Sequence, residues 1–188
     1  MEQTLKEEAA PKAKLLDKKS TVALVIVVAL LVALIRMFAF ETFFVSGDSM
    51  APTINSGELV FVNRFAYDFS EPKRGDIVVA IPRVYPGRVI KRIIGLPGEW
   101  FSIENNRIVI RDSRTDKGVN LDESYLQLPD TPEVGTTRWN IDPKEYFALG
   151  DNRAASIDSR ELGPIDLWSI KGRVIASFDF RSFKLKVF

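Results

Sequence analysis

The chain is 188 residues long, contains no His and no Cys, and carries 26 Lys and Arg against 25 Asp and Glu, for a formal net charge of +1. The missing His and Cys exclude a Ser-His-Asp triad, a Cys nucleophile, a disulfide scaffold and a Cys/His zinc site. A nearly neutral chain also lacks the basic excess of a nucleic-acid-binding domain, so we expect no nucleic-acid partner.

The N-terminal 40 residues predict a tail and a membrane anchor. Residues 1–19 mix charges of both signs, with Lys crowded toward the end, and we expect a short disordered tail on the cytoplasmic side. Residues 21–35 carry no charge, and residues 20–40 would form about 30 Å of helix, enough to cross a bilayer. A buried core helix or a cleaved signal peptide would look similar, but no small-x-small cleavage site follows. We therefore predict an uncleaved transmembrane anchor.

Residues 41–188 read as one β domain, because short apolar or alternating runs are separated by Gly, Pro, Asn and Asp. Glu104-Asn105-Asn106 has the chemistry of a hairpin turn. The segment from about 102 to 145 contains a long polar part, which we interpret as an excursion without a core of its own. We predict a mainly β fold, a barrel or sandwich, after one transmembrane helix. The expected strands are 58–62, 76–81, 88–94, 101–103, 107–110, 146–149 and 171–178.

The stretch from Val45 to Thr53, Val-Ser-Gly-Asp-Ser-Met-Ala-Pro-Thr, is the first candidate site. Gly47 and Pro52 bracket Ser49 in backbone that disfavours regular helix or strand, so the Ser hydroxyl can stand exposed at a turn. An ordinary turn would give the same pattern. If Ser49 is a nucleophile, its base must be Lys, Asp or Glu, because the chain has no His.

The predicted strand over residues 88–94 supplies a candidate base. Its alternation places Lys91 on one face and Arg92 on the other, each between two aliphatic residues. If the Lys91 face is buried, the pKa of Lys91 falls toward neutrality, and a neutral amine can take a proton from a hydroxyl. The alternative is a Lys on an edge strand that guards against aggregation.

The polar stretch from Gly150 to Arg160 follows a predicted strand and is the third candidate. Ser156 could hydrogen-bond a neutral Lys amine and orient its lone pair, while Asp158 and Arg160 could pair and hold the loop still. A turn with a surface ion pair is the alternative.

Taken in order, four sequence boxes resemble the conserved boxes of the type I signal peptidases, or leader peptidases. That family consists of membrane-anchored Ser/Lys endopeptidases that remove signal peptides from exported proteins. One box alone is a weak signal, whereas four in order behind an apolar N-terminal run are specific. The boxes are Ser49-Met50-x-Pro52-Thr53, Arg74-Gly75-Asp76-Ile77-Val78, Lys91-Arg92-x-x-Gly95-Leu96-Pro97-Gly98, and Gly150-Asp151-Asn152 with Ser156-x-Asp158-Ser159-Arg160.

The resemblance implies Ser49 as nucleophile, Lys91 as general base and Ser156 as a residue oriented on Lys91, with no metal or cofactor. It also implies the backbone N–H of Ser49 as an oxyanion donor. Some members add a side-chain hydroxyl two positions before the nucleophile, where this chain has Gly47.

Other departures lie near these boxes. Ser46 replaces a Pro that often precedes the first box, and Ala154 and Ala155 stand where many members have Asp and Asn.

The resemblance also implies a substrate, namely preprotein signal peptides with small residues, typically Ala, at the first and third positions before the cut. We expect the substrate to add as a strand near Val89 to Lys91. An apolar patch around the site should lie on the lipid, and its candidate is the Phe-rich stretch 38–44, for which interfacial aromatic residues that end the span are an equally good interpretation. Ordinary core packing is the alternative role for the apolar residues that could line two shallow substrate pockets. These candidates are Phe43, Val45, Met50, Ile54, Val60, Val79, Val89 and Ile90.

The implied location is the cell or thylakoid membrane, with a single span and residues 41–188 on the outer, periplasmic or lumenal side. Two other functions stay open. A Ser/Lys self-cleaving protease similar to the repressor autoproteases would be expected to carry an N-terminal DNA-binding domain, and an apolar run is found there instead. A non-catalytic, membrane-tethered domain that captures extended peptides is opposed only by the joint presence of Ser49 and Lys91.

Overall fold

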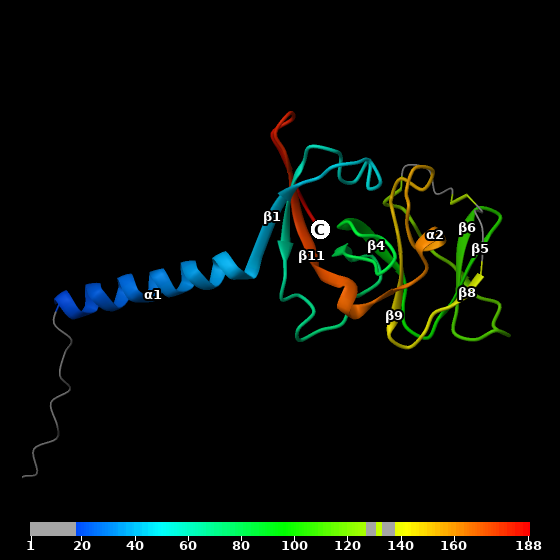
Figure 1. Cartoon of the computed structure of the whole chain (residues 1–188), viewed down its shortest axis with the longest axis horizontal. Helices are drawn as coiled ribbons and strands as arrows, with labels where there is room; N and C mark the ends of the chain where they lie inside the picture. Colours follow the sequence, from blue (N-terminus) through cyan, green and yellow to red (C-terminus); the bar gives the residue numbers. More distant parts are fainter. Residues whose placement is uncertain (1–17, 127–130, 133–137) are drawn as a thin grey trace, which may run out of the picture. The chain divides into compact units, whose positions relative to one another are not determined.

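The computed structural model describes residues 18–126, 131–132 and 138–188 (Figure 1). Residues 1–17 of the predicted tail lie outside this description, as do residues 127–130 and 133–137 of the predicted excursion. The chain forms two compact units, one ending at Phe38 and the other comprising Ala39–Phe188.

Helix α1 spans Lys18–Ala39 and is built mainly from Ala, Leu, Val and Ile. Its large apolar side chains from Val22 to Val32 are each at least 50% exposed. In the part of the chain that the structure describes, no helix meets both the length and the apolar character that a bilayer crossing needs, so the predicted transmembrane anchor is not confirmed.

The second unit is mainly β and contains an eight-stranded sheet in the order β1-β2-β11-β3-β4-β9-β10, with β12 paired to β11. All of these pairs are antiparallel. The predicted strands at 58–62, 76–81, 88–94, 146–149 and 171–178 are confirmed as β2, β3, β4, β9 and β11. The strands are β1 (Phe40–Phe44), β2 (Leu59–Asn63), β3 (Ile77–Ala80), β4 (Val89–Gly95), β9 (Glu145–Leu149), β10 (Ile165–Asp166), β11 (Ile170–Asp179) and β12 (Lys184–Val187).

A smaller sheet has the order β7-β6-β5-β8, and Figure 1 shows β5, β6 and β8 grouped on the β9 side of the domain, away from β1. The two predicted strands at 101–103 and 107–110 are confirmed. Asn105 and Asn106 both have positive φ, 51° and 58°, as a two-residue type I′ hairpin requires, so the predicted turn is confirmed too. The strands are β5 (Trp100–Glu104), β6 (Arg107–Arg111), β7 (Val119–Asn120) and β8 (Arg138–Asn140).

The smaller sheet is packed rather than peripheral. Phe101, Ile103 and Ile108 from this sheet, with Ile141 just after it, form one buried cluster with Ile94, Phe147 and Leu149 of the main sheet. The polar composition of the excursion concealed this packing, because only a few apolar residues in it point inward. The excursion is therefore packed firmly against the main sheet, and its other side chains can contact residues of that sheet.

A second buried cluster lies beneath the first candidate loop. It joins Met50 and Ile54 from that loop to strands of the main sheet, with Phe43, Val45 and Phe188 packed at its margin. Burying a side chain the size of Met contributes about 1.5–3 kcal/mol to stability. Because Met50 directly follows Ser49, its burial fixes where the Ser49 hydroxyl emerges. The sheet residues of this cluster are Val60, Val62, Ile77, Val79, Ile90 and Val174.

Candidate active site

Ser49 lies on the irregular connection between β1 and β2, as its flanking residues predicted. Gly47 has φ of +101°, in the left-handed region that favours Gly. The connection then tightens, since the Ala51 N–H donates to the Asp48 carbonyl at 3.1 Å and the Ile54 N–H donates to the Met50 carbonyl at 2.9 Å. The Ser49 side chain is left half-buried at the rim of the domain.

Lys91 projects from β4, which pairs with β3 on one side and β9 on the other. Its exposed fraction is only 4%, so the alternative of a guard residue on an exposed edge strand is wrong. The Lys91 Nζ donates to Ser49 Oγ at 2.8 Å. Two residues that stand 42 positions apart in the chain are thereby brought into direct contact.

The surroundings of Lys91 disfavour its charged form. Burial lowers the pKa of Lys91 from 10.5 to about 8, and the nearby Arg160 charge acts in the same direction, while Asp158 and Asp151 oppose it. An amine with this pKa is substantially neutral near pH 8. Its lone pair can then accept the Ser49 proton.

The Gly150–Asn152 turn lies directly against the Ser49 backbone. The Asn152 N–H donates to the Ser49 carbonyl at 3.0 Å, and Asn152 Nδ2 donates to the Asp48 carbonyl at 3.1 Å. A Cβ at Gly150 would lie 2.4 Å from the Ser49 carbonyl oxygen and 2.2 Å from Ser156 Oγ. Only Gly permits this close approach, so sterics explain why residue 150 is Gly.

Ser156 lies beside the nucleophile but not in the predicted contact. Its side chain is buried, and its Oγ has no hydrogen-bond partner among the described residues, so the expected bond to Lys91 is not made. Ser156 Oγ lies instead beside Gly150, 2.2 Å from where a Cβ on that residue would be, and the Lys91 amine is bonded to Ser49.

Asp158 and Arg160 form the predicted pair, and the pair is buried rather than superficial. Arg160 Nε donates to Asp158 Oδ1 at 2.9 Å and Arg160 Nη2 donates to Asp158 Oδ2 at 3.0 Å, a two-pronged geometry. Asp158 Oδ2 also accepts the Gly150 N–H at 3.0 Å. The same carboxylate caps helix α2 (Ser159–Leu162), so it joins the start of the loop to its end.

An open groove of about 540 Å³ runs past Ser49 and Lys91. One wall comes from residues 43–50, which include Gly47, and the other from Tyr85 and residues 88–91. Of the predicted substrate-binding residues, Phe43, Val45, Met50, Val89 and Ile90 line this groove.

The assignment of the other three predicted pocket residues is corrected. Ile54, Val60 and Val79 do not line the groove but pack behind Met50 and Ile90 in the core. Four lining residues that the sequence did not indicate are Tyr85, Arg88, Ala155 and Ile157.

Comparison with known proteins places this chain in a family. The family model described as signal peptidase, peptidase S26, matches residues 18–178. The chain belongs to this family of signal peptidases. It is similar to signal peptidase I of Bacillus caldolyticus, with 36% identity over 169 residues, covering 84% of this chain and 87% of that protein. It is also similar to signal peptidase I of Leptolyngbya laminosa, with 34% identity over 178 residues, 89% of this chain and 82% of that protein.

A crystal structure of signal peptidase I from Enterococcus faecalis V583 aligns with a TM-score of 0.45 and 30% identity, over 55% of this chain and 97% of that one. The family match and the relatives confirm the resemblance drawn from the four boxes, and this signal peptidase is a serine endopeptidase.

Two arginines of this signal peptidase have positions that the boxes did not explain. Arg92, next to Lys91, donates to Asp151 through Nε at 2.9 Å and Nη2 at 2.6 Å. Arg153 is buried against Glu123, a residue of the excursion. The boxes contain Arg92 but not Arg153, and spacing alone gave no signal for Glu123. Among the described residues, no group of three or more carboxylates could hold a metal ion.

Proposed function

We propose that this protein removes N-terminal signal peptides from exported preproteins, with Ser49 as the nucleophile and a neutral Lys91 as the general base. The observation that carries the proposal is the 2.8 Å contact between Lys91 Nζ and Ser49 Oγ at the floor of an open groove. Burial of the amine, which lowers the pKa of Lys91 to about 8, supports its role as a base.

The proposed reaction is acyl transfer. Lys91 takes the Ser49 proton while Ser49 Oγ attacks the carbonyl carbon of the scissile peptide bond, and the Ser49 N–H stabilises the tetrahedral oxyanion. The protonated Lys91 then donates its proton to the leaving amine as the C–N bond breaks, which leaves an acyl-enzyme. Lys91 next deprotonates a water molecule that attacks the ester, and Ser49 regains its proton. Asp158 and Arg160 support this centre by holding the loop beside it, and Ser156 lies in that loop with its buried Oγ unbonded among the described residues.

The substrate is proposed to bind as an extended strand in the groove. β9 pairs with β4 only from Arg92 onward, so Val89 to Lys91 keep one edge without a strand partner in the described sheet. β1, whose end forms the opposite wall, is the terminal strand of the same sheet. A peptide that binds between them can form main-chain hydrogen bonds with these strands. Packed apolar walls around Ser49 favour small side chains near the cut, since larger ones would clash.

The membrane face of the function is also a proposal. Residues 1–19 are proposed as a cytoplasmic tail, residues 20–40 as a single-pass anchor and residues 41–188 as the catalytic domain, with its excursion at about 102–145, on the outer or lumenal side. The exposed apolar side chains of α1 support contact with lipid.

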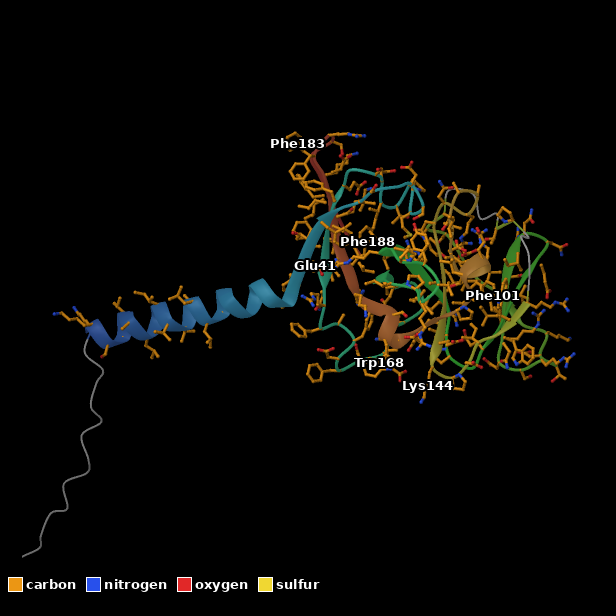
Figure 2. The ribbon with its side chains drawn as sticks, in the orientation of Figure 1. Glu41, Phe101, Lys144, Trp168, Phe183 and Phe188 are labelled. Atoms are coloured by element: carbon orange, nitrogen blue, oxygen red, sulfur yellow. The ribbon has the colours of Figure 1, made fainter. Side chains whose placement is uncertain are left out.

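A second apolar surface belongs to the catalytic domain itself. Phe44, on the groove wall, contacts Phe180 with ring centroids 6.1 Å apart. Phe183, at the tip of the β11–β12 hairpin in Figure 2, is 81% exposed. These exposed aromatic rings support the proposal that the groove opens close to a bilayer surface.

The decisive experiment uses the detergent-solubilised full chain and a preprotein with an Ala-x-Ala site. We expect mass spectrometry of the product to show a mature N-terminus directly after that site. Ser49→Ala and Lys91→Ala should each abolish cleavage while circular dichroism shows an intact fold, and Lys91→Arg should be as inactive as Lys91→Ala because Arg does not act as a base. Undiminished cleavage by Lys91→Ala would remove the mechanism. Cleavage of the chain itself, without cleavage of the preprotein, would support an autoprotease instead.

The topology has its own test. The anchor predicts that the full chain floats with lipid vesicles after alkaline carbonate washing, and that protease added outside reaches residues 41–188 in oriented membranes. Release of the full chain into the carbonate supernatant would contradict the anchor.

A further inference from the structure

A buried network outside the Ser49–Lys91 pair begins at Arg153. Its Nε donates to the Gly150 carbonyl at 3.0 Å, and its own carbonyl accepts Arg160 Nη2 at 2.7 Å. Arg153 thus ties together the beginning and the end of the polar loop that lies against Ser49. Its side chain is only 3% exposed, so its charge needs a partner within the domain.

Glu123 is that partner, and it comes from the excursion. It lies just after β7, and its carboxylate receives Arg153 Nη1 at 3.0 Å as well as Nη2. The remaining guanidinium hydrogens reach Thr131 Oγ1 and, at 3.2 Å, the Tyr125 hydroxyl oxygen. Glu123 has a side-chain exposure of 4%. The pair is therefore nearly free of solvent screening, and each charge depends on the other.

Tyr125 connects this network to the strand that carries the base. Its hydroxyl donates to Glu123 Oε1 at 2.7 Å, and burial raises the pKa of Tyr125, with the neighbouring Glu123 charge acting in the same sense, so this proton stays in place. The guanidinium carbon of Arg92 lies 4.1 Å from the centre of the Tyr125 ring. Residues 123–125 consequently contact the neighbours of both reacting groups, Arg92 beside Lys91 and Arg153 beside the turn on Ser49.

Loss of the Glu123 charge would act on the turn through Arg153. A guanidinium without its carboxylate is disfavoured in the interior and would move toward water, which releases the Gly150 carbonyl. The adjoining Asn152 N–H holds the Ser49 carbonyl at 3.0 Å, so a displaced turn changes where Ser49 stands relative to Lys91. A misplacement of about 1 Å at a reacting atom can reduce a rate about 100-fold.

We infer that Glu123, acting through Arg153, is a positioning residue that holds the Gly150–Asn152 turn against Ser49 and keeps the nucleophile within bonding distance of its base. This inference rests on the proposed function for its kinetic consequences. The geometry of the turn itself is independent of that function.

The experiment compares Glu123→Ala and Glu123→Gln in the full chain with a matched control, Glu104→Ala. Glu104 accepts two bonds from Arg111 Nη2, at 3.0 and 3.1 Å, in the same small sheet but away from the loop. For Glu123→Ala we expect kcat on a signal-peptide substrate to fall about 10- to 100-fold while KM changes by less than about threefold. Glu123→Gln keeps one acceptor oxygen, so its kcat should lie between that of Glu123→Ala and that of the unsubstituted protein. Glu104→Ala should cleave normally.

Two further readouts distinguish positioning from simple loss of stability. A loosened turn admits water to Lys91, so the rise of activity with pH should shift to higher pH in Glu123→Ala and not in Glu104→Ala. Hydrogen exchange in residues 149–156 should accelerate in Glu123→Ala alone, because the Gly150 and Asn152 N–H bonds weaken.

The outcomes separate the inference from the function on which it rests. If the unsubstituted protein cleaves and Glu123→Ala retains its kcat and pH profile, Glu123 does not position the site, whatever its melting temperature. If the unsubstituted protein cleaves no preprotein, the proposed function fails, and hydrogen exchange still decides the structural part. Should Glu123→Ala not fold, the same measurements on Glu123→Gln apply, and unchanged exchange in residues 149–156 would overturn the inference.

Discussion

The pH dependence of cleavage follows directly from the position of Lys91. Burial brings the pKa of Lys91 from 10.5 to about 8. At pH 7 a group with a pKa of about 8 is neutral in roughly 10% of molecules, against about 0.03% for an ordinary Lys, so burial raises the reactive fraction about 300-fold. Below pH 8 the value of kcat/KM should therefore rise about tenfold for each pH unit and then level off.

The assay measures kcat/KM on a fluorogenic signal-peptide substrate from pH 6 to 10 at constant ionic strength. The substrate should lack titratable groups near the cut, so that the profile reports the enzyme. Circular dichroism at each pH establishes that the fold persists across the range. A profile that is flat from pH 6 to 9, or a rise that continues undiminished to pH 10, would refute the argument that burial prepares this amine as a base.

Three further predictions concern the same site. Lys91→Met should raise the free energy of unfolding by up to about 3 kcal/mol at pH 7 in urea titration, because below about pH 8 Lys91 is protonated in both the folded and the unfolded chain and the fold carries the full cost of the buried ammonium. This gain should vanish as pH rises from about 8 to 10.5, and a gain independent of pH would contradict this account. Gly150→Ala should reduce kcat more than about 100-fold, because its Cβ would lie 2.4 Å from the Ser49 carbonyl oxygen; normal cleavage would mean that the turn does not hold Ser49. Asp158→Ala should lower the free energy of unfolding by about 3–5 kcal/mol, because it leaves Arg160 buried without its partner; a loss below 1 kcal/mol in urea titration would show that the loop is not held by this pair.

The parts of the site that sequence predicted are those with a local signature. The alternation around Lys91 indicated a strand, and the Gly and Pro around Ser49 indicated a turn, because both patterns reflect the backbone of the residues themselves. The contact between Ser49 and Lys91 depends on the topology of the sheet, which the local patterns do not reveal. The resemblance of the ordered boxes to a known family predicted that contact instead.

What sequence missed was decided by long-range packing. Position near the boxes makes Ile54, Val60 and Val79 candidates for the substrate pockets, but position along the chain does not say which side of an apolar cluster faces the groove. β1 (Phe40–Phe44) escaped because its Phe residues continue the preceding apolar run. The role of Glu123 depends on a partner 30 positions later in the chain, and nothing in its own neighbourhood marks it.

The half-paired β4 strand has a consequence for inhibitor chemistry. Where β9 leaves Val89 to Lys91 uncovered, the protein offers amide and carbonyl groups whose spacing every polypeptide matches. In the proposed binding mode, this edge contacts only the ligand backbone, and selection among side chains is left to the apolar walls of the groove. A peptidomimetic with N-methylated amides along that edge would bind weakly even with ideal Ala side chains, because it lacks the N–H donors. A rigid strand mimic with minimal side chains would compete with any preprotein for this edge.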